Sequence, residues 1–317
     1  MKDAPVRQHT VPKTYLKLFV APETVDEVWV FRKIPNDVRR MSVASVTIQN
    51  NFYDFEFTSQ EFNDAKHIER ERNRSFESTI NKLLWRIAYQ AENRKSFLLK
   101  PAQKAELAVQ LAYQYMRTKG FRVAYENLIS AESPERVLAS AEPEDDRFGK
   151  MLLSDASLIQ IAKKLFHEYE WVFRVNRTNA PYVTSDNPVI FTNDVLPGFP
   201  YLLGHPDVFG FFPLTPRVLL FMVPKGQRYA SMPDGQAQPS PGGDFVKMAN
   251  TFQVLAAVHE VFSAERSFLD YMAATRVEGH GVNMATKVKP LYQKIRSEAA
   301  TMEETGTLLI TPNTGDS

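Results

Sequence analysis

Hydrophobic positions in the first 60 residues alternate and cluster as they do in β-strands. Two runs rich in β-branched and aromatic residues, Glu27–Phe31 and Val43–Ile48, predict two strands. The turn-forming residues Pro35–Asp37 separate them. Ahead of the strands, Pro12 suits the first turn of a short helix reaching Phe19. The segment over residues 20–60 is therefore expected to be strand-rich.

From residue 63 onward the apolar residues recur every three or four positions, which predicts helices through residue 170. The first predicted helix carries its apolar stripe from Ile68 to Ile87, and Asn63 or Asp64 can cap it. A second predicted helix runs from about Ala102 to Leu128, with a break at Gly120, and a third covers residues 152–169. The polar stretch over residues 133–147 predicts a loop or a short surface helix.

Strand-like runs return over residues 171–223, and a helical pattern follows over residues 244–296. Residues 298–317 form a polar tail. Because strands and helices come in blocks and do not alternate, we predict a single α+β domain over residues 7–297. Its sheet is expected to be mixed or mainly antiparallel, with a central helical segment and a C-terminal helical region. Two loops rich in proline and glycine, Val195–Asp207 and Pro224–Asp244, interrupt the second strand-rich block.

Composition narrows the classes of function. The chain has 317 residues, 44% of them hydrophobic and 24% charged, so it can bury a substantial core. Its net charge of +1 argues against a broad nucleic-acid surface, and any such binding would have to be local. The absence of cysteine excludes disulfides, thiolate nucleophiles and cysteine-ligated metals.

Localisation is predicted from what the sequence lacks. The N-terminal stretch MKDAPVRQHTVPKTYL has no continuous apolar segment of the signal-peptide type, and no run of about 18 apolar residues occurs. We therefore expect a cytoplasmic protein without membrane contact. The motifs HExxH, GxxxxGK[ST], GxSxG and GxGxxG are absent, and the histidine spacing gives no support to a metal site. No cofactor and no metal are expected.

Four ordered stretches carry a family resemblance: QHTVPKTYLKLF at 8–19, NFY at 51–53 with the following helix containing Phe76 and Glu77, AYQYMRT at 112–118, and TSDNPV at 184–189 followed by FPLTP at 212–216. Together they resemble a bacterial family known as domain of unknown function 4238, over roughly residues 7–265. The resemblance implies a shared fold and no established activity. It also places five polar residues in one family pattern: His9, Glu77, Gln114, Arg117 and Asp186.

Three of these residues are candidates for catalysis, and each has a structural alternative. His9 could transfer protons near neutral pH, or it could be a structural histidine bonded to the backbone. Glu77 lies at the edge of an apolar helical stripe, where it could be a general base or could bridge to Arg70, Arg72 or Arg74. Arg117 could clamp a phosphate with its two-pronged donor group, or it could hold loop carbonyls or Glu77.

The remaining candidates are predicted to bind substrate. Gln114 shares a helix face with Arg117 and places an amide in an apolar stripe. Ser185, Asp186 and Asn187 follow a predicted strand in a turn-forming context. They could project into a cleft, or they could form a purely structural turn. Residues 213–216 (PLTP) are expected to form a rigid turn.

Two hypotheses follow from these residues. In the first, the chain is a metal-independent, RNase-like enzyme that cleaves phosphodiesters as a toxin or phage-defence factor, with RNA or another phosphate-bearing ligand as partner. His9 and Glu77 would be the acid–base pair, and Arg117 and Gln114 would stabilise phosphate charge. In the second, the polar residues are structural and the chain is a non-catalytic binding module. Phe199, Tyr201 and Leu202 are then candidate contact residues.

Overall fold

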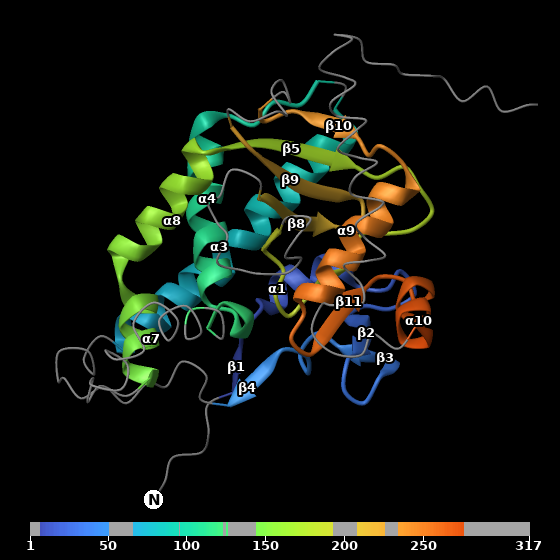
Figure 1. The fold of residues 1–317 in the computed structure, drawn as a ribbon, viewed down its shortest axis with the longest axis horizontal. Helices are drawn as coiled ribbons and strands as arrows, with labels where there is room; N and C mark the ends of the chain where they lie inside the picture. The colour runs from blue at the N-terminus through green and yellow to red at the C-terminus, as the bar shows by residue number, and fades with distance from the viewer. Residues whose placement is uncertain are drawn as a thin grey trace, which may run out of the picture.

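The computed structural model describes residues 7–50, 66–94, 96–122, 125, 144–192, 208–225 and 234–275. Within these ranges strands and helices fall into separate groups, and all but one of the strand pairs are antiparallel. The α+β prediction is confirmed. Figure 1 shows a helical layer beside a five-stranded sheet, with a second, smaller sheet below it.

The five-stranded sheet has the order β10–β5–β9–β8–β7. Its strands are β5 (Tyr169–Val175), β7 (Ile190–Thr192), β8 (Phe209–Thr215), β9 (Val218–Pro224) and β10 (Ala237–Pro239). Side chains on both faces of β8 and β9 are buried, so both faces of the sheet must be covered by other elements.

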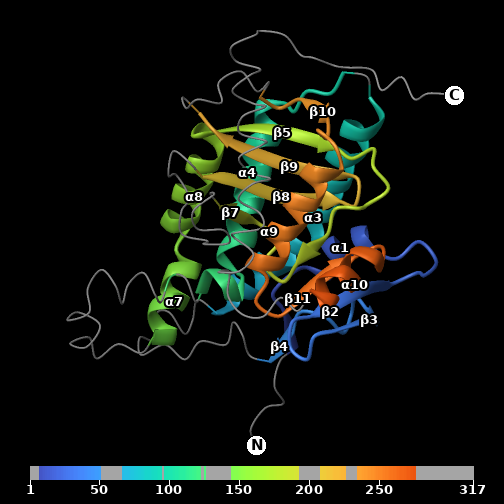
Figure 2. The same ribbon diagram turned by 45° about the vertical axis from the view of Figure 1, so that its right-hand side comes forward.

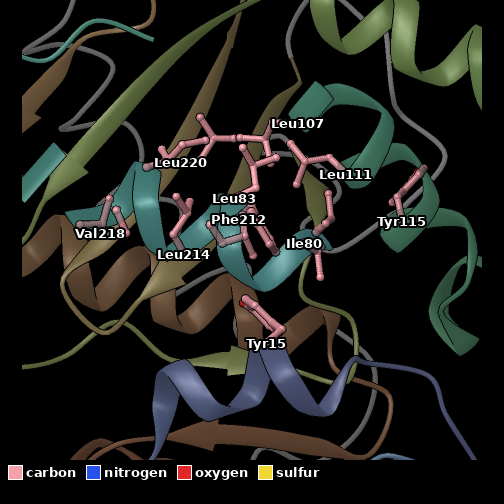
Figure 3. Close-up of a cluster of buried hydrophobic side chains, with 14 of the residues drawn as sticks. Tyr15, Ile80, Leu83, Leu107, Leu111, Tyr115, Phe212, Leu214, Val218 and Leu220 are labelled. Carbon is pink, nitrogen blue, oxygen red and sulfur yellow. The ribbon is translucent and has the colours of Figure 1, made fainter. Parts of the chain in front are cut away.

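Helices cover the two faces of this sheet. On one side lie α3 (Lys66–Asn93) and α4 (Pro101–Met116), and on the other lies α9 (Gly243–Ala256) (Figure 2). Next to α4 lies α8 (Asp155–His167), which follows α7 (Glu144–Leu153). Figure 3 shows the core between α3, α4 and the sheet, built from Ile80, Leu83, Leu107, Leu111, Phe212, Leu214 and Leu220.

The smaller sheet has the order β3–β2–β11–β6 and is antiparallel throughout. Its strands are β2 (Glu27–Arg32), β3 (Asp37–Ser42), β6 (Thr184–Ser185) and β11 (Glu260–Ser263), and α10 (Ser267–Ala274) packs against β2 and β3. A separate pair joins β1 (Arg7–His9) to β4 (Ile48–Asn50).

A short helix is hydrogen-bonded to both sheets. The helix α1 (Lys13–Leu16) continues as the 3-10 turn η1 (Lys17–Phe19), close to the predicted bounds. The buried hydroxyl of Tyr15 donates to the carbonyl oxygen of Pro213 on β8 (2.6 Å) and lies 2.8 Å from Thr184 Oγ1 on β6. Because one side chain bonds to a strand of each sheet, α1 fixes the sheets relative to each other. Figure 3 shows Tyr15 projecting from α1 toward the core.

Three local predictions were wrong. Residues 43–47 of the strand predicted at Val43–Ile48 form a turn whose Val43 and Val46 fill the core, and only Ile48 belongs to a strand, β4. The strand β3 lies earlier and exposes Arg39 and Arg40. The helical pattern predicted from residue 244 is interrupted by β11, a strand too short to show alternation. Pro213–Thr215, expected in a turn, lie in β8, where the register of pairing with β9 shifts.

Several predicted features lie outside the described residues. These are the tail and the end of the C-terminal helical region (276–317), the loop over 195–207 with Phe199, Tyr201 and Leu202, and the NFY stretch at 51–53. The side chains of Arg70, Arg72 and Arg74 are likewise outside the description. Among the helices of the described part of the chain, none combines the length and the apolar character needed to cross a membrane.

Candidate functional site

Arg117 lies where α4 ends and joins three separate elements. Its side chain is only 1% exposed, and its guanidinium lies over the rings of Phe76 (5.2 Å) and Tyr113 (5.6 Å). Its Nη2 donates to the carbonyl oxygen of His9 (2.6 Å) and lies 3.7 Å from Glu77 Oε1. The arginine therefore holds β1 and α3 against the end of α4. A guanidinium buried this deeply does not reach a ligand at the surface.

The imidazole of His9 is half-buried and its tautomer follows from its contacts. Nδ1 lies 3.1 Å from the carbonyl oxygen of Val46, which can only accept a hydrogen bond, so Nδ1 carries the proton. Thr47 Oγ1 lies 3.5 Å from the same nitrogen. Nε2 of the neutral ring is then left with a lone pair, as a proton acceptor requires.

Electrostatics favour this neutral form. Burial lowers the pKa of His9 below its ordinary value of 6.5, and the nearby Lys13 and Arg117 lower it further. Glu77 and the hydrogen bond to Val46 act in the opposite direction without reversing the shift. His9 is thus unprotonated at neutral pH.

Glu77 is a partly exposed carboxylate that interacts electrostatically with His9. Its side chain is 37% exposed, and Thr14 Oγ1 donates to its main-chain carbonyl oxygen (3.2 Å), fixing α1 against α3. Lys13, on the same helix as Thr14, is also half-buried. His9, Glu77 and Lys13 therefore combine a proton acceptor, a carboxylate and a cation in one region.

Gln114 is bound to the backbone beside His9. Its Nε2 donates to the carbonyl oxygen of Thr10 (3.4 Å), one turn of helix before Arg117. Its Oε1 is buried and has no hydrogen-bond partner among the described residues. Because Gln114 is only 1% exposed, its role in the structure is to position the segment that carries His9.

Asp186 accepts hydrogen bonds from three consecutive backbone amides. They belong to Val258 (2.9 Å), His259 (2.7 Å) and Glu260 (3.2 Å), in the connection between α9 and β11. Burial raises the pKa of Asp186, and the three amides and Lys33 oppose that rise. The arrangement gives Asp186 a clear structural role, in keeping with the turn-forming alternative.

Ser185 and Asn187 are also satisfied internally. Ser185 Oγ donates to Gln253 Oε1 (2.8 Å) and accepts from the amide of Asn187 (3.2 Å). Asn187 Oδ1 accepts from Thr118 Oγ1 (3.0 Å), and its Nδ2 donates to the carbonyl oxygen of Ala256 (3.4 Å). Both side chains are buried, so they fasten β6 to α9 and to the end of α4.

All seven candidate residues belong to one connected network. Thr118, which bonds Asn187, follows Arg117, which bonds His9. Glu260, whose amide bonds Asp186, accepts from the amide of Thr47 through Oε2 (3.2 Å), and Thr47 contacts His9. The network separates into two partly exposed members, His9 and Glu77, and a buried remainder that positions them.

Sequence reasoning missed two residues near His9. Glu260 has a pKa raised by burial and by Asp186, but it lies on β11, which the helical pattern concealed. Lys13 lies inside the stretch QHTVPKTYL and could have been selected from its position four residues after His9. In the part of the chain that the structure describes, no group of three or more histidine, aspartate or glutamate side chains is placed to hold a metal ion.

The comparisons with known proteins give a family and no activity. No curated protein and no solved structure matches the chain. Residues 7–267 match the family described as "Protein of unknown function (DUF4238)". That range covers most of the chain, including every candidate residue, and the chain belongs to the DUF4238 family.

Proposed function

We propose that the chain is an enzyme that cleaves phosphodiester bonds in RNA by acid–base catalysis. The observation that carries the proposal is the state of His9, which is neutral, has its ring fixed through Nδ1 and has Nε2 as proton acceptor. The accessible carboxylate of Glu77 and the cation of Lys13 belong to the same region. The substrate would be cytoplasmic RNA, and a role as a bacterial toxin or phage-defence factor is part of this proposal.

RNA suits a site of this kind because it carries its own nucleophile. Nε2 of His9 takes the proton from the ribose 2′-hydroxyl, and the resulting oxygen attacks the adjacent phosphorus. The bond to the 5′-oxygen breaks, and that leaving oxygen takes the proton from the His9 imidazolium, which the carboxylate of Glu77 stabilises. The products are a 2′,3′-cyclic phosphate and a free 5′-hydroxyl. Lys13 opposes the negative charge of the phosphate during the step.

In this proposal Arg117 and Gln114 do not stabilise phosphate charge, the role that they have in the first hypothesis from the sequence. Both are almost completely buried, so we assign them to positioning the His9 segment and not to the phosphate. Ser185, Asp186 and Asn187 position the same network from the other side. In this proposal substrate contacts only the accessible residues.

A non-catalytic binding module is the alternative, and one observation favours it. Five of the seven candidate side chains are buried and bonded inside the protein, as expected of a structural network: Gln114, Arg117, Ser185, Asp186 and Asn187. In that case substitution of His9 or Glu77 would lower stability without abolishing any catalysis.

The test is an RNA-integrity assay with purified wild type, His9→Ala, His9→Gln and His167→Ala at high protein concentration. His167 is an exposed histidine at the end of α8 and serves as the matched control. Wild type and His167→Ala should degrade total RNA to fragments with cyclic phosphate ends, and both His9 variants should leave it intact. Thermal unfolding of each variant checks that loss of cleavage is not loss of fold. RNA that stays equally intact with wild type and with buffer would remove the proposal.

A further inference from the structure

The helix α3 carries two aromatic side chains on the face turned away from the core. Its buried face consists of Phe76, Ile80, Leu83, Leu84, Ile87, Ala88 and Ala91. Trp85 and Tyr89 are instead 56% and 55% exposed. Their rings are stacked on each other, with centroids 5.2 Å apart and an angle of 13° between the planes. Aromatic rings of this size usually gain stability from burial, so an exposed stacked pair calls for an explanation.

Two basic side chains flank this pair. Lys82 lies three residues before Trp85, and Arg86 lies three residues before Tyr89, so each cation neighbours a ring on the helix surface. Both cations are exposed. The other charged residues in the C-terminal half of α3 and just after it in the sequence are Glu92, Arg94 and Lys95.

A further cation reaches this end of the helix from the sheet. Arg177, in the segment after β5, donates through Nη2 to the carbonyl oxygen of Glu92 (3.1 Å). The local excess of positive charge contrasts with the net charge of +1 for the whole chain. Any nucleic-acid contact was expected to be local, and this is a local basic and aromatic surface.

We propose that Trp85 and Tyr89 form a base-stacking platform for single-stranded RNA, with Lys82 and Arg86 on the phosphates. Stacking on aromatic rings together with a basic surround is the usual way in which proteins hold single strands without reading sequence. Protein–protein interfaces are depleted in lysine, whereas the exposed Lys82 lies beside the aromatic pair, which favours a nucleic acid over a protein partner.

The position of Trp85 and Tyr89 allows one RNA strand to reach both the platform and the proposed active site. This inference rests on the proposed function. Trp85 follows Glu77 by eight residues on the same helix, which corresponds to about 12 Å along the axis and about 80° around it. A short single strand could therefore lie on the platform while a neighbouring phosphate lies near His9 and Glu77. The platform supplies affinity, and His9 supplies the chemistry.

Fluorescence anisotropy with a labelled 12-nucleotide oligouridylate tests the platform. Binding is measured for wild type, Trp85→Ala/Tyr89→Ala, Trp85→Phe and Tyr271→Ala, each also in a His9→Gln background to prevent cleavage. Tyr271 is an exposed aromatic on α10, away from the platform, and is the matched control. The double alanine variant should bind at least about tenfold more weakly, while Trp85→Phe and Tyr271→Ala should bind within about twofold of wild type. Replacing Lys82 and Arg86 by glutamine should reduce the salt dependence of binding.

The outcomes separate the two proposals. Equal affinity of wild type and the double alanine variant, with both cleaving RNA, would overturn the platform and leave the proposed activity standing. RNA that binds through the pair but is never cleaved would leave the platform standing and overturn the proposed activity. Wild type that does not bind the oligonucleotide at low salt would overturn the platform directly. Substitutions at exposed positions such as these usually change stability little, and thermal unfolding of the double variant checks this.

Discussion

The guanidinium of Arg117 donates to the carbonyl oxygen of His9 across 2.6 Å, although 108 residues separate the two in sequence. The backbone of His9 is thus held by Arg117, while its ring is held by the carbonyl oxygen of Val46. A buried residue and an accessible one are joined so that the first fixes the orientation of the second. The two residues are therefore expected to respond differently to substitution.

Replacing Arg117 should destabilise the protein strongly. Arg117→Leu removes the bond to His9 and both ring contacts from a buried position, and we expect a loss of about 2–3 kcal/mol in the free energy of unfolding. Arg117→Lys keeps the charge but loses the planar stacking, so its loss should be intermediate. Urea denaturation measures both.

The control for this prediction is Arg217→Leu. Arg217 also donates to a main-chain oxygen, that of Thr178 (2.7 Å), but it is exposed. Its replacement should cost under about 0.5 kcal/mol. Equal stability of Arg117→Leu and wild type would contradict the assignment of Arg117 as a clamp.

Stability should depend on pH through His9. Because the pKa of His9 is lower in the folded protein than its ordinary 6.5, the unfolded chain binds the proton more readily. The contribution of the neutral His9 to the free energy of unfolding is therefore complete above about pH 6.5. It declines as the pH falls toward the pKa of His9 in the folded protein. His259, whose pKa is also lowered, acts in the same direction.

Two measurements check this sign. NMR titration of the His9 ring should give a midpoint below 6.5, assigned by its absence in His9→Gln. The acid limb of any RNA-cleavage rate should fall in the same range, since His9 must be unprotonated to accept a proton. A His9 midpoint above 6.5 would be incompatible with the neutral ring described above.

Elements and residues could be predicted from the sequence where the pattern that marks them lies within a few neighbouring residues. Contacts between distant segments could not. The strand-rich block over residues 171–223 was predicted because strands such as β5 and β9 are continuous apolar runs, buried on both faces. Asp186 was predicted either to face a cleft or to belong to a structural turn, and its three amide donors lie 72 to 74 residues later. No local pattern reveals such donors. For Arg117 the sequence left a phosphate clamp and an internal clamp open, and only burial distinguishes them.

Asp186 should be essential for stability. Asp186→Ala leaves the amides of Val258, His259 and Glu260 without their acceptor, and buried unsatisfied donors cost about 1–3 kcal/mol each before relaxation. We expect a loss of at least about 3 kcal/mol, measured by urea denaturation. Asp186→Asn keeps one acceptor oxygen and should lose less. An unchanged midpoint for Asp186→Ala would show that the connection between α9 and β11 does not depend on this carboxylate.

A methyl group at Gly120 should disturb the network from the end of α4. A Cβ built at this position would lie 2.7 Å from Asn187 Nδ2 and 3.0 Å from its Cγ. Asn187 has little freedom to move, because Thr118 and the carbonyl oxygen of Ala256 hold its amide. We expect Gly120→Ala to lower the free energy of unfolding by about 1–3 kcal/mol.

Gly243→Ala provides the matched control, because a Cβ there meets nothing within 4 Å, and this variant should be neutral or slightly stabilising. If the contact with Asn187 is the cause, Gly120→Ala should cost less in an Asn187→Ala background than in wild type. Differential scanning calorimetry of the four combinations gives this coupling. Strict additivity of the two substitutions would mean that Gly120 is required for some reason other than the space occupied by Asn187.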